Sequence, residues 1–490
     1  MVNNIPLNIV VVGHTNTGKT SLLRTLTRDT SFGEVDNAPG TTRQVAGATQ
    51  WLNDKMALVW FDTPGLEDSV ALRDWVETPE TLSPADQNPQ HARLDGPQKI
   101  QRFLNSSLAH NRFEQEARVL DKVLASDAAL YVIDARDPVL AKHRDELALL
   151  VACAKPIIAV LNFTAKSIDN PFSNIDAWID ILARNGLHVY VWFDTVSPAL
   201  DAERHLFEAL AQVLPKHKSL FVDLVAQTAA ARLVRRNRAY ELIADLIVDV
   251  ASWRLPTPSD ESALKEAQHI QQSRIRAREQ KCLNALLITY SFNKHDVLSM
   301  PLTLVQGRWE TDLFAPEALR EVGFELSKGA AAGALAGAAV DVMTGGLSLG
   351  TGTLVGAAAG AGWQGLEKWG GRLLGQIKGH RELTVDDTIL KLLCLRQLQL
   401  LYALEQRGHA AIEPMHLSVP DLNASTHTIK MTGSQPERQH SVIDSKAFKK
   451  TIRLARQHPD WSTLKGVVST PQARDRAVSM LSQAMQSEII

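Results

Sequence analysis

The sequence predicts an N-terminal α/β domain, with a mostly parallel sheet flanked by helices, followed by a mainly α-helical C-terminal region. Three observations carry this prediction. A glycine-rich turn follows an apolar run at the start of the chain, apolar runs of strand length then alternate with amphipathic stretches, and helical spacing alone follows from about residue 216. We therefore expect an N-terminal domain over 1–216 and a C-terminal domain over 217–490.

Composition places the chain among ordinary globular proteins. Its 490 residues exceed one compact core, and hydrophobic residues make up 45 % and charged residues 22 % of them. The 52 basic and 54 acidic residues nearly cancel, so charge does not indicate a nucleic-acid partner. The three cysteines show no metal-ligand spacing, and the N-terminus lacks the basic flank and cleavage site of a secretory signal. We therefore expect a cytoplasmic protein without zinc or disulfides.

The turn that follows the first apolar run carries a phosphate-binding pattern. "GHTNTGKTS" fits G-x-x-x-x-G-K-[ST], after a strand and before the amphipathic stretch "SLLRTLTRD". Its glycines let the main chain curl so that successive amides point at phosphates, while the lysine neutralises them and the hydroxyl binds Mg2+. An incidental glycine-rich turn is the alternative for this motif alone. The predicted nucleotide-binding residues here are Gly13, Asn16, Thr17, Gly18, Lys19, Thr20 and Ser21.

Two further motifs, "APGTTRQ" and "VWFDTPGLED", follow in the order and spacing of a nucleotide switch. In such a switch a threonine reaches the metal and the terminal phosphate, an aspartate at a strand end holds a metal-bound water, and a glycine amide touches the same phosphate. We assign these roles to Thr42, Asp62 and Gly65. Lys19 completes the predicted catalytic set, and Thr20 is the third predicted Mg2+ ligand beside Thr42 and Asp62.

Together these motifs resemble the translation-factor-related GTPases, and among them the branch that includes Era and the TrmE-type tRNA-modification proteins. "GHTNTGKTS", "PGTTR" and "DTPGL" carry the likeness, which covers roughly the first 215 residues. "AALYVIDARDP" and "KPIIAVLNF" look like buried central strands of that fold, because both are near-continuous apolar runs. The resemblance implies a P-loop GTPase that binds GTP and Mg2+ and hydrolyses GTP to GDP and phosphate as a molecular switch.

Two positions of the resemblance bear on hydrolysis. Asn16 matches the family asparagine that helps several members hold a potassium ion (K+) against the phosphates, and Leu66 stands where Ras-like proteins keep a water-orienting glutamine. The resemblance therefore implies slow hydrolysis that potassium stimulates. Glu67 and Asp68 are candidates to position the water, although acids after a turn are more often solvated surface.

The guanine-recognition motif is incomplete. The family reads guanine with N-K-x-D, whereas in "LNFTAKS" Asn162 keeps its place, Phe163 replaces the lysine and Ala165 replaces the aspartate. Ser197, in "DTVSP", is the predicted residue of the final base loop, and Gln44 replaces the usual aspartate after "TTR". A nucleotide-binding scaffold with negligible turnover or altered base specificity is therefore the first alternative function.

A long insert, about 67–126, separates the second switch motif from the next strand. It begins with a polar, proline-rich stretch typical of a loop and continues with helical apolar spacing. Two readings stay open. The insert either binds a partner in one nucleotide state, or it is a tolerated surface insertion.

Helical spacing dominates the C-terminal region. The stretches 220–253 and 385–408, and a third that begins at "SALKEAQHIQQ", each predict a long amphipathic helix. Between the last two, 329–375 carries two glycine ladders with a four-residue period. Because glycines on one face let helices approach closely, this segment predicts a glycine-zipper hairpin of two helices.

The hairpin has alternative environments. No charged residue occurs from 342 to 366, and about twenty uncharged residues can cross a bilayer. However, small and hydroxyl residues dominate there, and Asp341 would cost about 2.5 to 3.5 kcal/mol at a helix centre. The sequence therefore predicts either a membrane-associated hairpin, peripheral at or inserted into the inner membrane, or a soluble glycine-packed one. Low-complexity disorder is a third reading.

An N-terminal GTPase followed by a helical region with a glycine-rich hairpin also resembles, over the whole chain, a bacterial family described as a GTPase fused to a C-terminal domain of unknown function. We expect the helical half to act as an effector module toward a membrane or protein partner, with a nucleotide-dependent dimer as a further expectation. An RNA- or ribosome-associated GTPase is the second alternative function, and the near-neutral charge counts against it.

Overall fold

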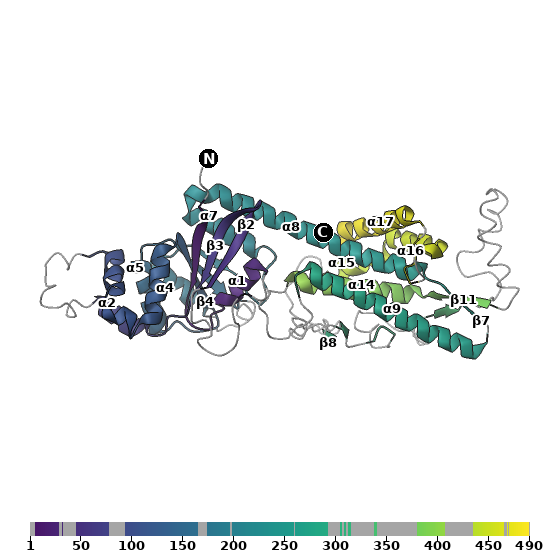
Figure 1. The fold of residues 1–490 in the computed structure, drawn as a ribbon, viewed down its shortest axis with the longest axis horizontal. Helices are drawn as coiled ribbons and strands as arrows, with labels where there is room; N and C mark the ends of the chain where they lie inside the picture. Colours follow the sequence, from purple (N-terminus) through teal and green to yellow (C-terminus); the bar gives the residue numbers. More distant parts are fainter. Residues whose placement is uncertain are drawn as a thin grey trace. The chain divides into compact units, whose positions relative to one another are not determined.

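The chain divides into two compact units, Met1–Leu233 with Glu405–Pro414 and Val234–Leu404 with Met415–Ile490 (Figure 1). The division falls within one long helix, α8 (Lys218–Ser252). The computed structural model describes residues 5–28, 32, 46–77, 94–164, 174–196, 198–258, 260–292, 304–305, 308–309, 312–314, 338–340, 380–406, 435–464, 468 and 470–489.

The first unit is built on a six-stranded sheet in the order β2-β3-β1-β4-β5-β6. Only β2 runs antiparallel to its neighbour, so the expected mostly parallel sheet is confirmed. β4 and β5 are buried along their whole length, which explains their near-continuous apolar sequences. The strands are β1 (Leu7–Val12), β2 (Ala46–Leu52), β3 (Lys55–Asp62), β4 (Ala128–Asp134), β5 (Ile157–Asn162) and β6 (Tyr190–Trp192).

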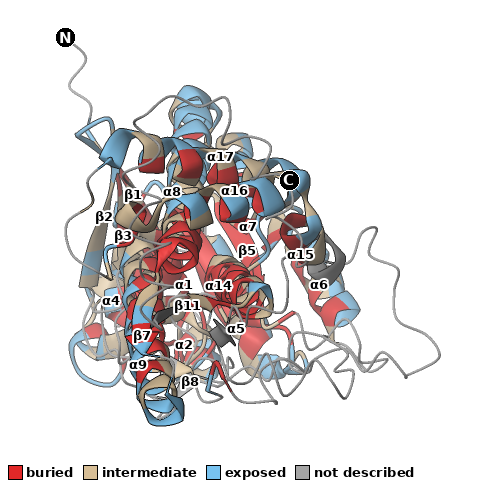
Figure 2. Cartoon of the chain, turned by 90° about the vertical axis from the view of Figure 1, so that its right-hand side faces the viewer, coloured by how far each residue is buried: buried red, intermediate tan, exposed pale blue. Residues whose placement is uncertain are grey.

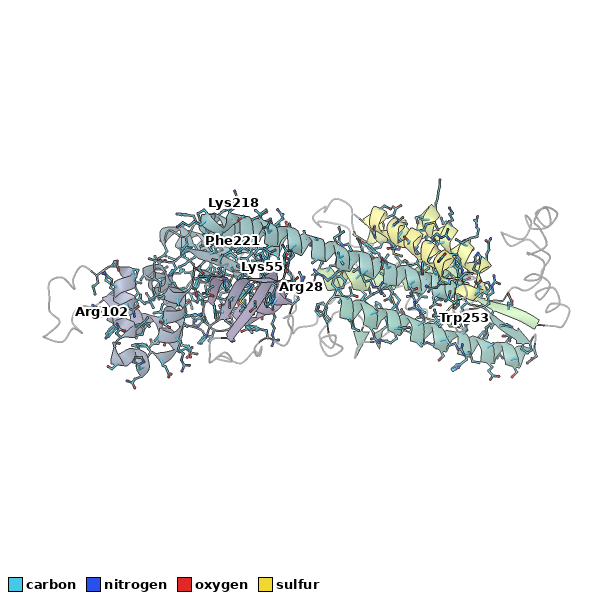
Figure 3. The ribbon with its side chains drawn as sticks, turned by 45° about the horizontal axis from the view of Figure 1, so that its top comes forward. Arg28, Lys55, Arg102, Lys218, Phe221 and Trp253 are labelled. Atoms are coloured by element: carbon cyan, nitrogen blue, oxygen red, sulfur yellow. The ribbon has the colours of Figure 1, made fainter. Side chains whose placement is uncertain are left out.

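Helices cover both faces of this sheet, each over its own hydrophobic cluster. In β1, Ile9 and Val11 face the first cluster while Val10 and Val12 face the second, as strand alternation requires. The first cluster also includes side chains of α1 and α7 and Phe221 of α8 (Figure 3). The helices are α1 (Lys19–Thr27), α2 (Ser69–Glu77), α3 (Gly96–Leu104), η4 (Ser107–His110), α4 (Glu114–Ala125), α5 (Ala141–Ala152), α6 (Ile175–Arg184), α7 (Ala202–Val213) and η5 (Pro215–His217).

The described part of the predicted insert is folded into the second cluster. α2, α3 and α4 contribute buried side chains there, among them Ile100 and Phe103 of α3, and Phe113 directly before α4 is buried with them. α3 begins with a capping box in which Asp95 and Gln98 bond each other's backbone amides. Residues 78–93, which hold most of the predicted loop, lie outside the described residues.

The second unit is mainly helical, as predicted, with a small antiparallel sheet in the order β10-β11-β7 and a two-stranded ribbon of β8 and β9. Its core contains the second part of α8, Trp253 beyond it, α9 and α14 (Figures 2 and 3). The elements are β7 (Leu255–Pro258), α9 (Glu261–Thr289), β8 (Leu304–Val305), β9 (Arg308–Trp309), β10 (Ala338–Val340), β11 (His380–Val385), α14 (Asp387–Gln406), α15 (Gln435–Asp444), α16 (Lys446–Gln457), η8 (Pro459–Trp461) and α17 (Pro471–Ile489).

α14 differs from the amphipathic helix predicted over 385–408. Its buried residues run around most of its circumference, including polar Arg396 and Gln397. A helix that is apolar on nearly every side is stable only when other elements surround it, and α14 lies at the centre of this unit's core (Figure 2). The sequence predicted the helix but not that nearly all of its faces are buried.

The predicted glycine hairpin falls mostly outside the described residues. Of 329–375 the structure describes only Ala338–Val340, which form strand β10 paired with β11. The helix predicted at these three residues is therefore wrong there, because their backbone pairs with the neighbouring strand. Among the helices that the structure describes, none combines the length and apolar character needed to cross a bilayer.

A buried carboxylate of α9 makes the second unit sensitive to pH. Glu279 accepts from Gln397 and lies 3.2 Å from Arg396 Nε. Burial raises the pKa of Glu279 to about 7, and the Arg396 charge only partly opposes this. Because the pKa is higher in the folded state than in the unfolded chain, protonation of Glu279 stabilises the fold at low pH, and this stabilisation is lost as pH rises through about 7.

We therefore expect α9 and α14 amides to lose about 1 to 3 kcal/mol of opening free energy between about pH 5 and about pH 8. Hydrogen exchange on the full chain, corrected for intrinsic rates, measures this. Glu279→Gln should weaken the pH dependence. Glu382→Gln, which changes a more exposed carboxylate of the same unit, should not. Equal pH dependence in all three proteins would contradict the assignment to Glu279.

Candidate functional site

The loop between β1 and α1 curls against the carboxyl ends of the central strands. Gly18, at the N-terminus of α1, has a φ of 93°, in the left-handed region. A Cβ atom at position 18 would lie only 2.3 Å from Asn162 Nδ2. The tight curl therefore requires glycine here, as the motif predicted. Asn16, earlier in the loop, also has a positive φ of 64°.

Lys19 is the buried charge of this loop. Its Nζ donates to the carbonyls of Gly13, at 3.1 Å, and His14, at 2.8 Å. Desolvation lowers the pKa of Lys19 to about 8, although Asp62 and Glu146 act in the opposite direction. An anionic group beside Nζ would stabilise the ammonium form, so this position favours phosphate.

Two of the three predicted metal ligands lie together. β3 pairs with β1 so that Asp62 is in register with Val11, beside the start of the loop. Thr20 Oγ1 donates to Asp62 Oδ2 at 2.5 Å, and Asp62 is almost fully buried. A hydroxyl and a carboxylate are the oxygen donors that Mg2+ accepts, so these residues fit the ion. Thr42, the third predicted ligand, lies outside the described residues.

The second switch motif lies directly on the phosphate loop. A Cβ atom at Gly65 would lie 2.6 Å from Thr15 N, so only glycine permits this approach. Leu66 is fully buried in the hydrophobic cluster below, and its side chain therefore points away from solvent. The Glu67 side chain is exposed, as expected for solvated surface, and Asp68 pairs with Arg112 at 3.2 Å.

Asn162 joins the phosphate loop to the loops that follow β5 and β6. Its Nδ2 donates to Thr17 O at 2.8 Å, while its Oδ1 accepts from the amides of Phe163 and Thr195. This predicted residue therefore holds three segments in place. Ala165 and Ser197, the other positions singled out for base recognition, lie outside the described residues.

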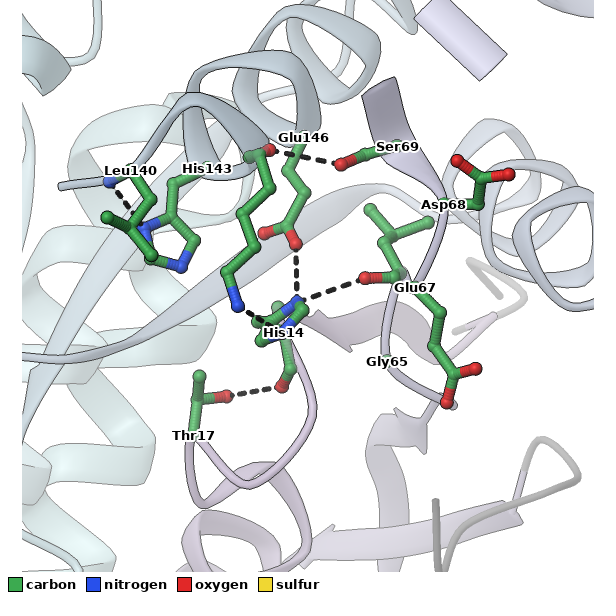
Figure 4. Close-up of polar contacts among 12 residues, drawn as sticks. His14, Thr17, Gly65, Glu67, Asp68, Ser69, Leu140, His143 and Glu146 are labelled. Atoms are coloured by element: carbon green, nitrogen blue, oxygen red, sulfur yellow. Dashed lines mark hydrogen bonds and ion pairs between the residues drawn. The ribbon is translucent and has the colours of Figure 1, made fainter. Parts of the chain in front are cut away.

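Two groups near the site were not found from the sequence. The Arg136 guanidinium lies 4.0 Å from the centre of the Phe163 ring, where the family carries its base-packing lysine. Glu146 of α5 is fully buried and contacts His14 of the phosphate loop (Figure 4). Phe163 was visible as a substitution, but nothing in the pattern of α5 marks Glu146 as facing the loop.

Two family models match this chain. Residues 180–483, more than half of the chain, match the family model described as "Domain of unknown function (DUF3482)". The chain belongs to the DUF3482 family. Residues 8–163 of this DUF3482 protein match the model described as "50S ribosome-binding GTPase". Its N-terminal part is thus a P-loop GTPase domain with the α/β fold described above.

Individual relatives cover only parts of this DUF3482 protein. GTPase Der from Chlamydia muridarum is 36 % identical over 76 residues, which span 16 % of the chain and 15 % of Der. Era from Aquifex aeolicus bound to GDP·AlF4− is 18 % identical, with a TM-score of 0.30, over 42 % of this chain and 56 % of that one. The structure of Era with MgGDPNP and a 16S ribosomal RNA fragment gives the same identity, coverage and TM-score.

The steric limit at Gly18 yields a direct test of the phosphate loop. Gly18→Ala should weaken binding of a GTP analogue by about 10- to 100-fold, because strain of about 1 to 3 kcal/mol displaces the loop or Asn162. Gly47→Ala in β2 is the matched control, since its Cβ would meet Phe61 at an ordinary 3.6 Å. Fluorescence titration measures both affinities. Unchanged affinity in Gly18→Ala would contradict the site.

Proposed function

We propose that the N-terminal unit binds GTP with Mg2+ and hydrolyses it to GDP and phosphate as a molecular switch. The observation that carries the proposal is that Lys19, the Thr20–Asp62 pair and Gly65 meet around one curled loop. The match to the GTPase family model supports the same reading. This arrangement serves phosphoryl transfer, which depends on positioning and charge stabilisation rather than on covalent chemistry by the protein.

Each residue has a distinct part in this proposal. Lys19 would leave the carbonyls of Gly13 and His14 and donate to phosphate oxygens instead. Thr20 would hold Mg2+ directly and Asp62 through a water, and the bound ion would neutralise phosphate charge. The Gly65 amide would contact the terminal phosphate. Water attacks that phosphorus, the bond to the bridging oxygen breaks, and GDP leaves with inorganic phosphate as the second product.

Orientation of the attacking water needs another group, because the Leu66 side chain is buried and apolar. We propose that a potassium ion beside Asn16 supplies part of this function. Asn16 holds a left-handed backbone conformation in the middle of the loop, which asparagine tolerates better than most residues. The scaffold alternative, binding with negligible turnover, draws its support from the same buried leucine.

Single-turnover hydrolysis separates these two functions. We expect GTP cleavage to be about tenfold faster in K+ than in Na+, since a fixed cation stabilises developing charge. Asn16→Gly, which keeps the positive φ accessible, should lose most of this difference, and Lys19→Ala should cleave no GTP. Binding of GTP without cleavage in either salt would favour the scaffold. Equal rates in both salts would exclude the potassium site.

We also propose that the base is guanine, although Phe163 replaces the family lysine. Asn162 fixes the start of the base loop, and the Phe163 ring beside Arg136 offers a flat surface for a purine. Competition against a labelled GTP analogue should rank GTP above ATP by about tenfold or more, because hydrogen bonds to the base edge discriminate. Equal competition by GTP, ATP and XTP would instead indicate altered base specificity.

A further inference from the structure

His14, the second residue of the phosphate loop, makes three contacts with two other segments through its imidazole (Figure 4). Its Nδ1 lies 2.8 Å from Glu146 Oε1 of α5 and 3.1 Å from the carbonyl oxygen of Leu66. Its Nε2 lies 2.7 Å from Lys142 Nζ, also of α5. The phosphate loop, the second switch motif and α5 therefore meet at one side chain.

The partners of the ring assign its tautomer. Nδ1 faces two oxygen acceptors, so it carries the hydrogen, and Nε2 faces the Lys142 ammonium, so it accepts. Glu146 is fully buried, and its second oxygen accepts from Tyr131 of β4 at 3.0 Å. Since flipping the ring would break all three contacts of His14, its orientation is tightly determined.

The same switch segment makes further polar contacts with α4 and α5. Gln115 of α4 donates to the Gly65 carbonyl, and Glu116 Oε1 accepts from the amides of Glu67, at 3.2 Å, and Asp68, at 2.9 Å. Ser69, where α2 begins, donates to the Lys142 carbonyl at 3.0 Å. Successive residues of 65–69 are therefore fixed by polar contacts, and His14 supplies the one that comes from the phosphate loop itself.

We propose that His14 is a positioning residue for hydrolysis, which fixes the path of Gly65 and Leu66 over the phosphate loop and couples that path to α5. This inference rests on the proposed GTPase function. Because Leu66 is buried, the terminal phosphate and its attacking water depend on backbone groups of this segment for their placement. Displacements of about 1 Å at a reacting centre can cost about 100-fold in rate, so the anchor of this backbone affects the chemical step.

The position of the Nδ1 donor on the His14 side chain decides which substitutions test its contacts. Asparagine carries its side-chain amide nitrogen at the same number of bonds from the backbone as Nδ1, whereas glutamine carries it one bond further away. His14→Asn should therefore keep the donor to Leu66 and Glu146, while His14→Ala and His14→Gln should not. His143→Asn is the matched control, because His143 is a neighbouring imidazole that bonds the Leu140 amide instead.

At saturating GTP, single-turnover cleavage by His14→Ala and His14→Gln should fall by about tenfold or more, with GDP affinity changed by less than about threefold. His14→Asn and His143→Asn should stay within about threefold of the wild-type rate. A wild-type rate in His14→Ala, or an equal loss in His14→Ala and His14→Asn, would overturn the positioning role.

Hydrogen exchange of the 65–72 amides in the nucleotide-free full chain tests the anchor without any hydrolysis. His14→Ala should accelerate their exchange by about threefold or more, and His14→Asn should not. Unchanged exchange in His14→Ala would overturn the inference even if the wild type cleaves GTP. If the wild type cleaves no GTP but His14→Ala still accelerates exchange, the contact of His14 with the 65–69 segment is supported and only the proposed function is overturned.

Discussion

The N-terminal unit depends on crowding of main chain at the carboxyl edge of its sheet. Where β1 ends, the chain turns within a few residues from buried strand to helix, and the Asn162 side chain fills the space beside Gly18. That crowding excludes water from Lys19 and leaves its ammonium among backbone carbonyls. A buried cation with exchangeable partners is a strong site for an anion, because charges interact more strongly in a medium of low dielectric constant.

Both units bury charge, but they use it differently. In the first unit, Lys19 and Asp62 contact residues of the phosphate loop at the proposed site, and Glu146 bonds His14 of the same loop. In the second, Asp249 of α8 accepts from Arg278 of α9 and from the Thr463 amide, so one carboxylate joins three segments of the core. Removing one partner of such a pair would leave an uncompensated buried charge, so the pairing favours a single alignment of these helices.

Much of the first unit could be predicted from sequence, because its features depend on local chemistry. The curled loop needs glycine at position 18, and buried parallel strands need continuous apolar runs, so both are visible in the residues themselves. The contact of Glu146 with His14 could not be predicted, because it joins positions far apart in the chain through tertiary packing. Likewise, helical spacing in α14 is the same whether one face or nearly every face is buried.

The most direct test of the account is a crystal structure of the full chain with Mg2+ and a nonhydrolysable GTP analogue. The account predicts that the phosphates lie within the loop from Gly13 to Thr20, with Lys19 Nζ bonded to phosphate oxygen instead of the Gly13 and His14 carbonyls. Thr20 should then coordinate the ion. A nucleotide bound elsewhere, or a loop that keeps Lys19 on both carbonyls at saturating analogue, would contradict it.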